Sequence, residues 1–190
     1  MVIFFFINHY IFAQFQSTYH FTNTTYVLNY KTDNPIYDLS NRWSYTPEVK
    51  VGVQGADVAI FSLGLKYQLM GGNTKDKNLL GAYYLLFPLH TTFLWKINSS
   101  ALWGFFDTGF EFGKALKVFN GWNQGIHYQF RKEYLGLLIA PGAEYCFLPR
   151  YSLTFQFYYS LQINDASNNL FIGKYHHYGF SLGIRYFKSK

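Results

Sequence analysis

Residues 151–163 read YSLTFQFYYSLQI, and this stretch decides the fold. Every odd-numbered position in it is aliphatic or aromatic, whereas the even-numbered positions are Ser, Thr, Gln, Tyr, Ser and Gln. An α-helix repeats every ~3.6 residues and cannot sort side chains in this way, but a β-strand places alternate residues on opposite faces. The stretch therefore predicts a β-strand with one apolar face and one polar face.

The same two-residue alternation recurs along the chain. Two segments are less regular: residues 80–96 are apolar on both faces, and the pattern within residues 18–30 changes phase near Thr24. Together the segments predict about eight β-strands, at 18–30, 48–54, 58–69, 80–96, 102–113, 134–147, 151–163 and 176–187.

The composition decides which face meets which solvent. Charged residues make up 14% of the 190-residue chain and aromatic residues 23%, whereas an average soluble domain has roughly 25% charged residues. The polar face is rich in glycine and serine and poor in lysine and glutamate, unlike an ordinary solvent-exposed face. No segment has the roughly 18 consecutive apolar residues of a transmembrane helix, and a closed barrel is the other fold that satisfies every backbone group in lipid. We therefore predict an all-β fold, a closed antiparallel up-and-down transmembrane β-barrel of about eight strands, with the polar face inside.

The gaps between the predicted strands alternate in length. Long gaps follow residues 30, 69, 113 and 163, and short gaps follow residues 54, 96 and 147. Outer-membrane barrels have short periplasmic turns and longer extracellular loops. The alternation therefore predicts a barrel in the outer membrane of a Gram-negative bacterium, with both termini periplasmic.

Aromatic residues gather near the predicted strand ends. Tyrosine and tryptophan favour the membrane–water interface, so two aromatic girdles are expected. The expected periplasmic girdle is Trp95, Trp103, Phe147, Tyr151, Tyr186 and Phe187, and the expected outer girdle is Trp43, Tyr45, Tyr134, Tyr175 and Tyr178.

The first residues resemble an export signal. Residues 2–13 read VIFFFINHYIFA, a short apolar stretch that ends in the small residue Ala13. We expect residues 1–13 to be a signal peptide and residues 14–190 to be the barrel domain, although no basic residue precedes the apolar stretch. The single cysteine, Cys146, excludes an internal disulfide and a cysteine-based metal site.

The polar face carries ionisable residues that would lie inside the barrel. Buried charges must be paired, and an eight-stranded barrel is just filled by its own side chains. We therefore predict a structural network of salt bridges and hydrogen bonds, with Lys66 or Arg185 as the partner of Asp107 and Glu111. The predicted lumen network is Lys66, Asp107, Glu111, Glu144 and Arg185, with Glu48, Lys50 and His90 on the same face.

No arrangement of residues predicts an enzyme site, a cofactor site or a metal site. Asp107 and Glu111 would lie about 13 Å apart along one strand, which is too far for a glycosidase pair. The histidines do not show the spacing of a zinc motif. Lipid A deacylases use a serine with a nearby histidine, whereas Ser160 has neither histidine nor asparagine beside it. We therefore expect a non-enzymatic protein without cofactor or metal.

The formal net charge is +6, and basic residues are frequent in the predicted outer loops. Cationic side chains bind lipid phosphates such as those of lipopolysaccharide, but the same residues are equally compatible with ordinary solvated loops. No nucleic-acid-binding motif is present, so no nucleic-acid partner is expected. The candidates for contact with lipid phosphates are Lys75, Lys77, Lys114, Lys117, Arg131 and Lys132, with Lys174 in the last loop.

Three segments resemble a known family. They read YYLLFPLHTTF at 83–93, RYSLTFQFYYSL at 150–161 and GFSLGIRYF at 179–187, and the resemblance extends over roughly residues 48–190. On these segments the chain resembles the small outer-membrane β-barrel domain family of Gram-negative bacteria, the PorT-like type. The last segment looks like the aromatic-ended final strand that barrel-assembly machinery reads, although residues 188–190 follow it. The resemblance implies an outer-membrane location, that machinery as a partner during biogenesis, and no defined activity.

These observations predict a monomeric, non-enzymatic outer-membrane barrel with a structural or surface-binding role through its extracellular loops. Two alternatives remain, a membrane-embedded lipid A-modifying enzyme and a soluble lipocalin-like carrier of an apolar ligand. A Ser–His contact at the outer rim would favour the enzyme. An apolar lumen with charged outward positions would favour the carrier.

Overall fold

The structure is a computed structural model, and it describes most of the chain after the predicted signal peptide. That predicted peptide, at residues 1–13, lies outside the described residues. No helix among the described residues is long and apolar enough to cross a membrane. The described residues are 16–32, 42–55, 58–73, 79–97, 101–119, 121–123, 126–128, 131–164 and 173–188.

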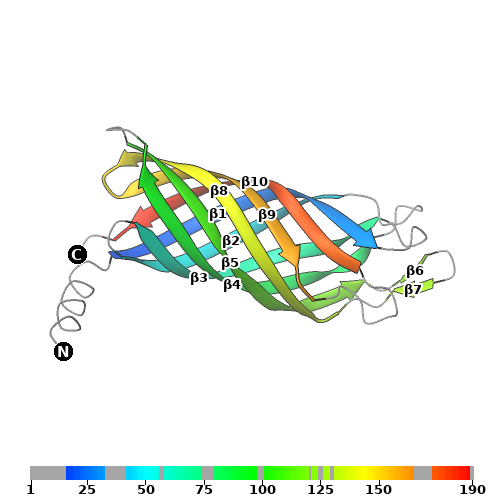
Figure 1. Cartoon of the computed structure of the whole chain (residues 1–190). Coiled ribbons are helices and arrows are strands. Elements are labelled where there is room, and N and C mark those ends of the chain that lie inside the picture. The colour runs from blue at the N-terminus through cyan, green and yellow to red at the C-terminus, as the bar shows by residue number, and fades with distance from the viewer. Residues whose placement is uncertain are drawn as a thin grey trace, which may run out of the picture.

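A closed antiparallel barrel of eight strands confirms the predicted fold (Figure 1). The barrel strands are β1 Gln16–Thr32, β2 Arg42–Gly55, β3 Ala59–Asn73, β4 Leu79–Lys96, β5 Leu102–Phe119, β8 Glu133–Leu148, β9 Tyr151–Gln162 and β10 Gly173–Phe187. Their order around the barrel is β1-β10-β9-β8-β5-β4-β3-β2, and β1 closes the barrel by pairing with both β10 and β2. A separate short hairpin lies between β5 and β8, formed by β6 Gly121–Asn123 and β7 Ile126–Tyr128.

The two ends of the barrel differ in their connections. Residues 56–58, 97–101 and 149–150 connect strands at one end, where β1 also begins and β10 ends (Figure 1). We refer to it as the turn end and to the opposite end as the loop end. The loop-end connections are residues 33–41, 74–78, 120–132 and 163–172.

The strands reach further toward the loop end than the sequence predicted. β2 begins at Arg42 instead of residue 48, and β3 continues to Asn73. The Gly-rich residues after Leu69 are part of the ladder with β4, and Gly71 has a φ of 138°, which residues with a side chain rarely adopt. The connection at 74–78 is therefore no longer than the turn at 97–101, and the predicted long gap after residue 69 is wrong.

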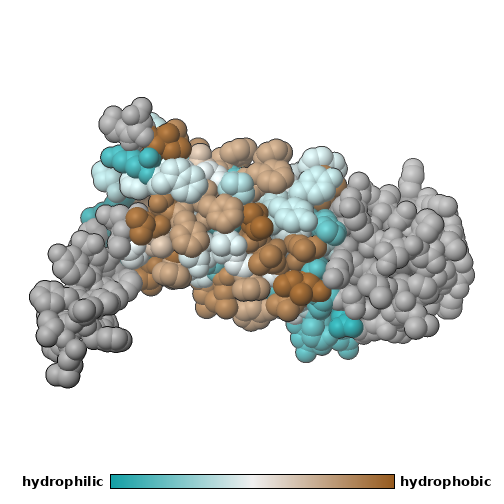
Figure 2. Space-filling model, in the orientation of Figure 1, coloured by the Kyte–Doolittle hydropathy of each residue, from teal (hydrophilic) through white to brown (hydrophobic). Residues whose placement is uncertain are grey.

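The barrel has an apolar exterior and a polar interior. In β3, Phe61 and Leu63 face outward and are more than half exposed, whereas Lys66 and Gln68 face inward and are buried. Figure 2 shows apolar residues over the visible wall of the barrel and hydrophilic residues toward its ends. On the described barrel strands, the charged residues at outward positions with a described side chain all lie near the loop end. They are Lys114, Lys117 and Glu133, of which Lys114 and Glu133 are register partners.

The two strands with a less regular sequence pattern, β1 and β4, keep one inward phase in the structure. The buried positions of β1 continue in one phase through Thr24, so the predicted phase change there is wrong. Its neighbours Asn23 and Thr25 are polar as well, and the contrast between the two faces of β1 is therefore weak. In β4, Tyr84 and Leu86 are buried inside the lumen, which explains why this strand is apolar on both faces.

An apolar cluster occupies the lumen at the turn end. Ile60, Leu94 and Phe105 are buried together, and Trp103 and Phe187 pack against them. Trp103 and Phe187 lie at the turn end, as predicted, but they face this cluster and not lipid. Their assignment to the periplasmic girdle is therefore wrong. The outward row of aromatic rings is Tyr19, Tyr186, Tyr151 and Phe147, with successive centroid distances of 6.1, 5.0 and 6.4 Å.

Four aromatic rings follow one another inside the lumen at the loop end. Tyr84, Tyr134, His177 and Tyr175 have successive centroid distances of 5.9, 6.5 and 6.0 Å. All four residues are buried. Tyr134 and Tyr175 therefore point inward, and their assignment to the outer girdle is wrong. The exposed aromatic residues of β2 near this end are Trp43 and Tyr45.

Candidate functional site

The lumen contains a network of buried charges. Inward positions of strands that are far apart in the sequence meet inside the barrel, so cations of one strand can reach carboxylates of another. A buried ion pair must recover the desolvation cost of both charges, which requires short contacts and additional hydrogen bonds. The described lumen holds three close pairs: Lys50 Nζ–Asp107 Oδ2 at 2.8 Å, Lys66 Nζ–Glu111 Oε1 at 2.7 Å, and Arg185–Glu144.

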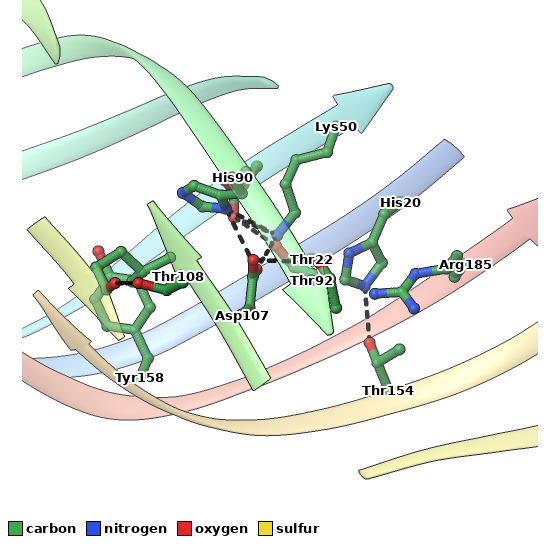
Figure 3. A network of polar contacts seen from close by, with 12 residues as sticks. His20, Thr22, Lys50, His90, Thr92, Asp107, Thr108, Thr154, Tyr158 and Arg185 are labelled. Atoms are coloured by element: carbon green, nitrogen blue, oxygen red, sulfur yellow. Dashed lines mark hydrogen bonds and ion pairs between the residues drawn. The ribbon is translucent and has the colours of Figure 1, made fainter. Parts of the chain in front are cut away.

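The Lys50–Asp107 pair has two further polar neighbours from β4 (Figure 3). His90 Nδ1 lies 3.3 Å from Lys50 Nζ and 3.3 Å from Asp107 Oδ2. Thr92, the register partner of Asp107, donates a hydrogen bond to Asp107 Oδ1 at 3.2 Å. The carboxylate thus receives hydrogen bonds on both oxygens, which stabilises its charge inside the barrel.

The structure corrects the predicted partner of Asp107. Lys66 binds Glu111, but Asp107 binds Lys50 and neither Lys66 nor Arg185. Barrel strands are tilted, so residues at one depth are offset along successive strands. Lys50 on β2 and Asp107 on β5 come together because of that offset, and a single sequence contains no direct measure of it.

Hydroxyl groups complete the Lys66–Glu111 pair. The Tyr158 hydroxyl accepts a hydrogen bond from Lys66 and lies 3.2 Å from Glu111 Oε2, and Lys66 Nζ lies 4.4 Å from the centroid of the Tyr158 ring. Ser160 donates to Glu111 Oε2 at 3.0 Å, and the Tyr134 hydroxyl lies 3.2 Å from Ser160 Oγ. These contacts offset the desolvation of both charges and join β3, β5, β8 and β9 across the lumen.

The third pair lies closer to the turn end. Arg185 of β10 binds Glu144 of β8, and Ser152 of β9 donates to the same carboxylate. The Arg185 guanidinium carbon lies 5.6 Å from the centroid of the Phe105 ring, within cation–π range. This pair therefore connects the polar network to the apolar cluster at the turn end.

Sequence reasoning missed the hydroxyl partners of these pairs. Tyr158 is the only aromatic residue on the polar face of residues 151–163, and this exception was the signal that could have identified it. Gly136, two residues after Tyr134 on the same face of β8, is a second signal. A Cβ atom at Gly136 would overlap the Tyr134 hydroxyl and lie 2.7 Å from the ring carbon Cζ. The glycine therefore provides the space that the Tyr134 ring occupies.

Replacing Gly136 by valine should lower the free energy of unfolding by about 1–3 kcal/mol, because the new side chain displaces the Tyr134 ring from a filled lumen. The control is Ala143→Val, which introduces the same side chain at an outward position of the same strand and adds two carbons instead of three. Urea unfolding of the two variants in detergent micelles measures the difference. Equal midpoints for both variants would contradict the packing argument.

The geometry provides no reactive serine in this network. Ser160 is fully buried, and its hydroxyl contacts Glu111 and Tyr134, so it is not the exposed, histidine-activated nucleophile of a lipid-modifying enzyme. Among the described residues, no group of three His, Cys, Asp or Glu side chains could hold a metal ion. The polar lumen and apolar exterior are also the reverse of the arrangement that a lipocalin-like carrier needs.

The predicted phosphate-contacting residues are only partly placed. Lys75 and Lys77 lie outside the described residues. Lys114, Lys117 and Lys132 are exposed near the loop end. The Lys132 carbonyl accepts a hydrogen bond from the amide of residue 115 at 2.6 Å. Lys132 therefore lies next to the part of β5 that contains Lys114.

Arg131 differs from the other basic residues of this group. It is half-buried, and its carbonyl accepts a hydrogen bond from the Tyr84 hydroxyl of the aromatic rings at the loop end. Its Nε is buried without a hydrogen-bond partner among the described residues. Arg131 is therefore attached to the barrel rim and is less available to a lipid headgroup than Lys114 or Lys132.

A closed barrel with an apolar exterior and a lumen filled by paired charges defines the class of transmembrane β-barrels. No family model and no curated protein matches the sequence. The crystal structure of neisserial surface protein A has the same fold, with a TM-score of 0.60 and 12% identity over 88% of this chain and 96% of that chain.

Two further solved structures align over most of the chain. The N-terminal β-barrel domain of Pseudomonas aeruginosa OprF has a TM-score of 0.49 and 11% identity over 92% of this chain and 100% of that chain. Ail, the attachment invasion locus protein of Yersinia pestis, has a TM-score of 0.49 and 12% identity over 90% of this chain and 99% of that chain. At 12% identity, the similarity to neisserial surface protein A is one of fold alone.

Proposed function

We propose that the protein is a non-enzymatic integral protein of the outer membrane of a Gram-negative bacterium. The observation that carries this proposal is the outward face, which is apolar around the barrel and has its described charges only near the loop end. A surface of this kind is stable in lipid and would aggregate in water. The fold shared with neisserial surface protein A supports the same environment.

The proposed role is structural or surface-binding and acts through the loop end. In this orientation both termini are periplasmic, and the exposed side chains of Lys114 and Lys132 lie at the level of lipopolysaccharide phosphates. Partners are outer-membrane lipid, including lipopolysaccharide, and the barrel-assembly machinery, which the aromatic end of β10 and the PorT-like resemblance support. We propose that the barrel acts as a monomer without a nucleic-acid partner.

Heat modifiability tests the membrane proposal. The membrane fraction is run on a detergent gel with and without boiling. A closed barrel that resists detergent migrates differently when unboiled, and this is the expected result. Recovery of the protein in the soluble fraction, with one migration position, would contradict the proposal.

The single cysteine tests the orientation. Cys146 lies near the turn end and lines a small opening there of about 140 Å³ together with Trp103 and Phe187. We expect a membrane-impermeant maleimide to label Cys146 only after the outer membrane is permeabilised. The control is Lys117→Cys in a Cys146→Ser background, which should be labelled on intact cells because residue 117 is exposed near the loop end. The reverse pattern would place the loop end in the periplasm.

A further inference from the structure

The described lumen holds more negative than positive charge. Its buried carboxylates are those of Glu48, Asp107, Glu111 and Glu144, whereas its buried cations are Lys50, Lys66 and Arg185. With neutral histidines, one negative charge is left over. An uncompensated charge in a low-dielectric interior is very unfavourable, and a bound cation or an added proton among these residues would relieve it.

Glu48 of β2 shares its nearest cation with another carboxylate, and its register partner Lys66 is bound to Glu111. Glu48 Oε2 accepts a hydrogen bond from Thr22 at 3.1 Å and lies 4.0 Å from Lys50 Nζ. Lys50 cannot neutralise Glu48 on its own, because its Nζ is also bound to Asp107 at 2.8 Å. The other oxygen of Glu48, Oε1, is buried and has no hydrogen-bond partner among the described residues.

Three more oxygen atoms on this side of the lumen have no hydrogen-bond partner in the part of the chain that the structure describes. They belong to Thr46, Ser181 and Gln156, whose side chains are at most 2% exposed. Thr46 is two residues from Glu48, and Thr24 of β1 is the register partner of both Thr46 and Ser181. Ser181 in turn faces Gln156 of β9. The arc β2-β1-β10-β9 thus presents one carboxylate, one amide and two hydroxyl oxygens to the lumen.

We propose that this wall binds one monovalent alkali cation, Na⁺ or K⁺, with Glu48 as the anionic ligand. Ser181, Gln156 and Thr46 supply neutral oxygen ligands, directly or through water. Hard cations prefer such all-oxygen surroundings. A single positive charge makes the lumen neutral, whereas a divalent ion would leave an excess positive charge near Lys50. Water alone would satisfy the orphaned oxygens but would leave one carboxylate in excess over the described buried cations.

The test compares salts that differ only in the cation. The purified full chain in neutral detergent is heated in NaCl, KCl or N-methylglucamine chloride at one concentration, and the folded fraction is read from unboiled gel migration. Ionic strength and anion are then constant, so screening cancels. We expect the unfolding midpoint to be about 3 °C or more higher in NaCl or KCl than in N-methylglucamine chloride, because a bound ligand stabilises the folded state.

Three variants connect that shift to the site. Glu48→Gln removes the anionic ligand and should abolish the difference between cations. Ser181→Ala keeps the charge, loses one oxygen ligand and should reduce the difference, so it tests the site even if Glu48→Gln does not fold. Glu133→Gln removes an exposed carboxylate and should leave the difference unchanged. Equal midpoints of the unmodified protein in all three salts, or an unchanged cation preference in Glu48→Gln, would overturn the proposal.

Discussion

Lys66→Met should lower the free energy of unfolding by about 3–5 kcal/mol, because it leaves the Glu111 carboxylate buried without its counter-charge. Lys66 Nζ lies 2.7 Å from Glu111 Oε1, and both residues are almost completely buried. Methionine has a similar length and fills the same space, so the loss reflects charge and not a cavity. Tyr158 and Ser160 stay in contact with Glu111, but neutral hydroxyl groups cannot replace the positive charge.

A double variant distinguishes the effect of losing the whole ion pair from the effect of losing one of its two charges. Lys66→Met combined with Glu111→Gln removes both charges and should recover most of the lost stability, because replacing a whole buried ion pair is often close to neutral. The exposed Lys114→Met serves as the control and should change the urea midpoint little. Urea unfolding of barrels refolded into lipid vesicles provides the measurement. A wild-type midpoint for Lys66→Met would mean that the network contributes nothing to stability.

The fold could be predicted because one physical rule acts on every strand. Residues 151–163 sort large apolar and small polar side chains onto opposite faces, and the structure places these faces in contact with the outside and the lumen. The rule failed where the contrast between faces is weak. The polar residues on both sides of Thr24 gave a sequence pattern that looked like a phase change. In β4, the inward-facing side chains of Tyr84 and Leu86 are apolar, so the inward face could not be recognised as polar.

The sequence allowed us to predict which charged residues lie in the lumen, but not which of them pair with each other. Each inward charge follows from the parity of its position, but its partner depends on strand tilt and on the register across several strands. For this reason Asp107 was assigned to Lys66 or Arg185 and is bound by Lys50. The prediction for Tyr134 was wrong for a related reason. A tyrosine near a strand end suits both an interfacial girdle and a lumen, and the space left by Gly136 favours the lumen.

The second large expected effect is the loss of stability when a charge is placed on the lipid-facing side of the barrel. Leu63 is 53% exposed near the middle of this face, and its register partners Val51 and Leu89 are exposed as well. Leu63→Arg should destabilise the barrel in lipid vesicles by about 2–4 kcal/mol, because a cation near the bilayer midplane loses its hydration. In a soluble barrel the same change would be harmless, since it would shrink an exposed apolar patch.

The same substitution outside the apolar band provides the control. Leu116 is 62% exposed and lies two residues beyond Lys114 toward the loop end, so Leu116→Arg should cost only about 0–1 kcal/mol, as expected near the interface. Both variants replace an exposed leucine by arginine, and depth in the membrane is the difference between them. Urea unfolding in vesicles compares their stabilities directly. Equal losses would mean that the position of Lys114 does not mark the edge of the lipid, and no loss for Leu63→Arg would mean that this face meets water.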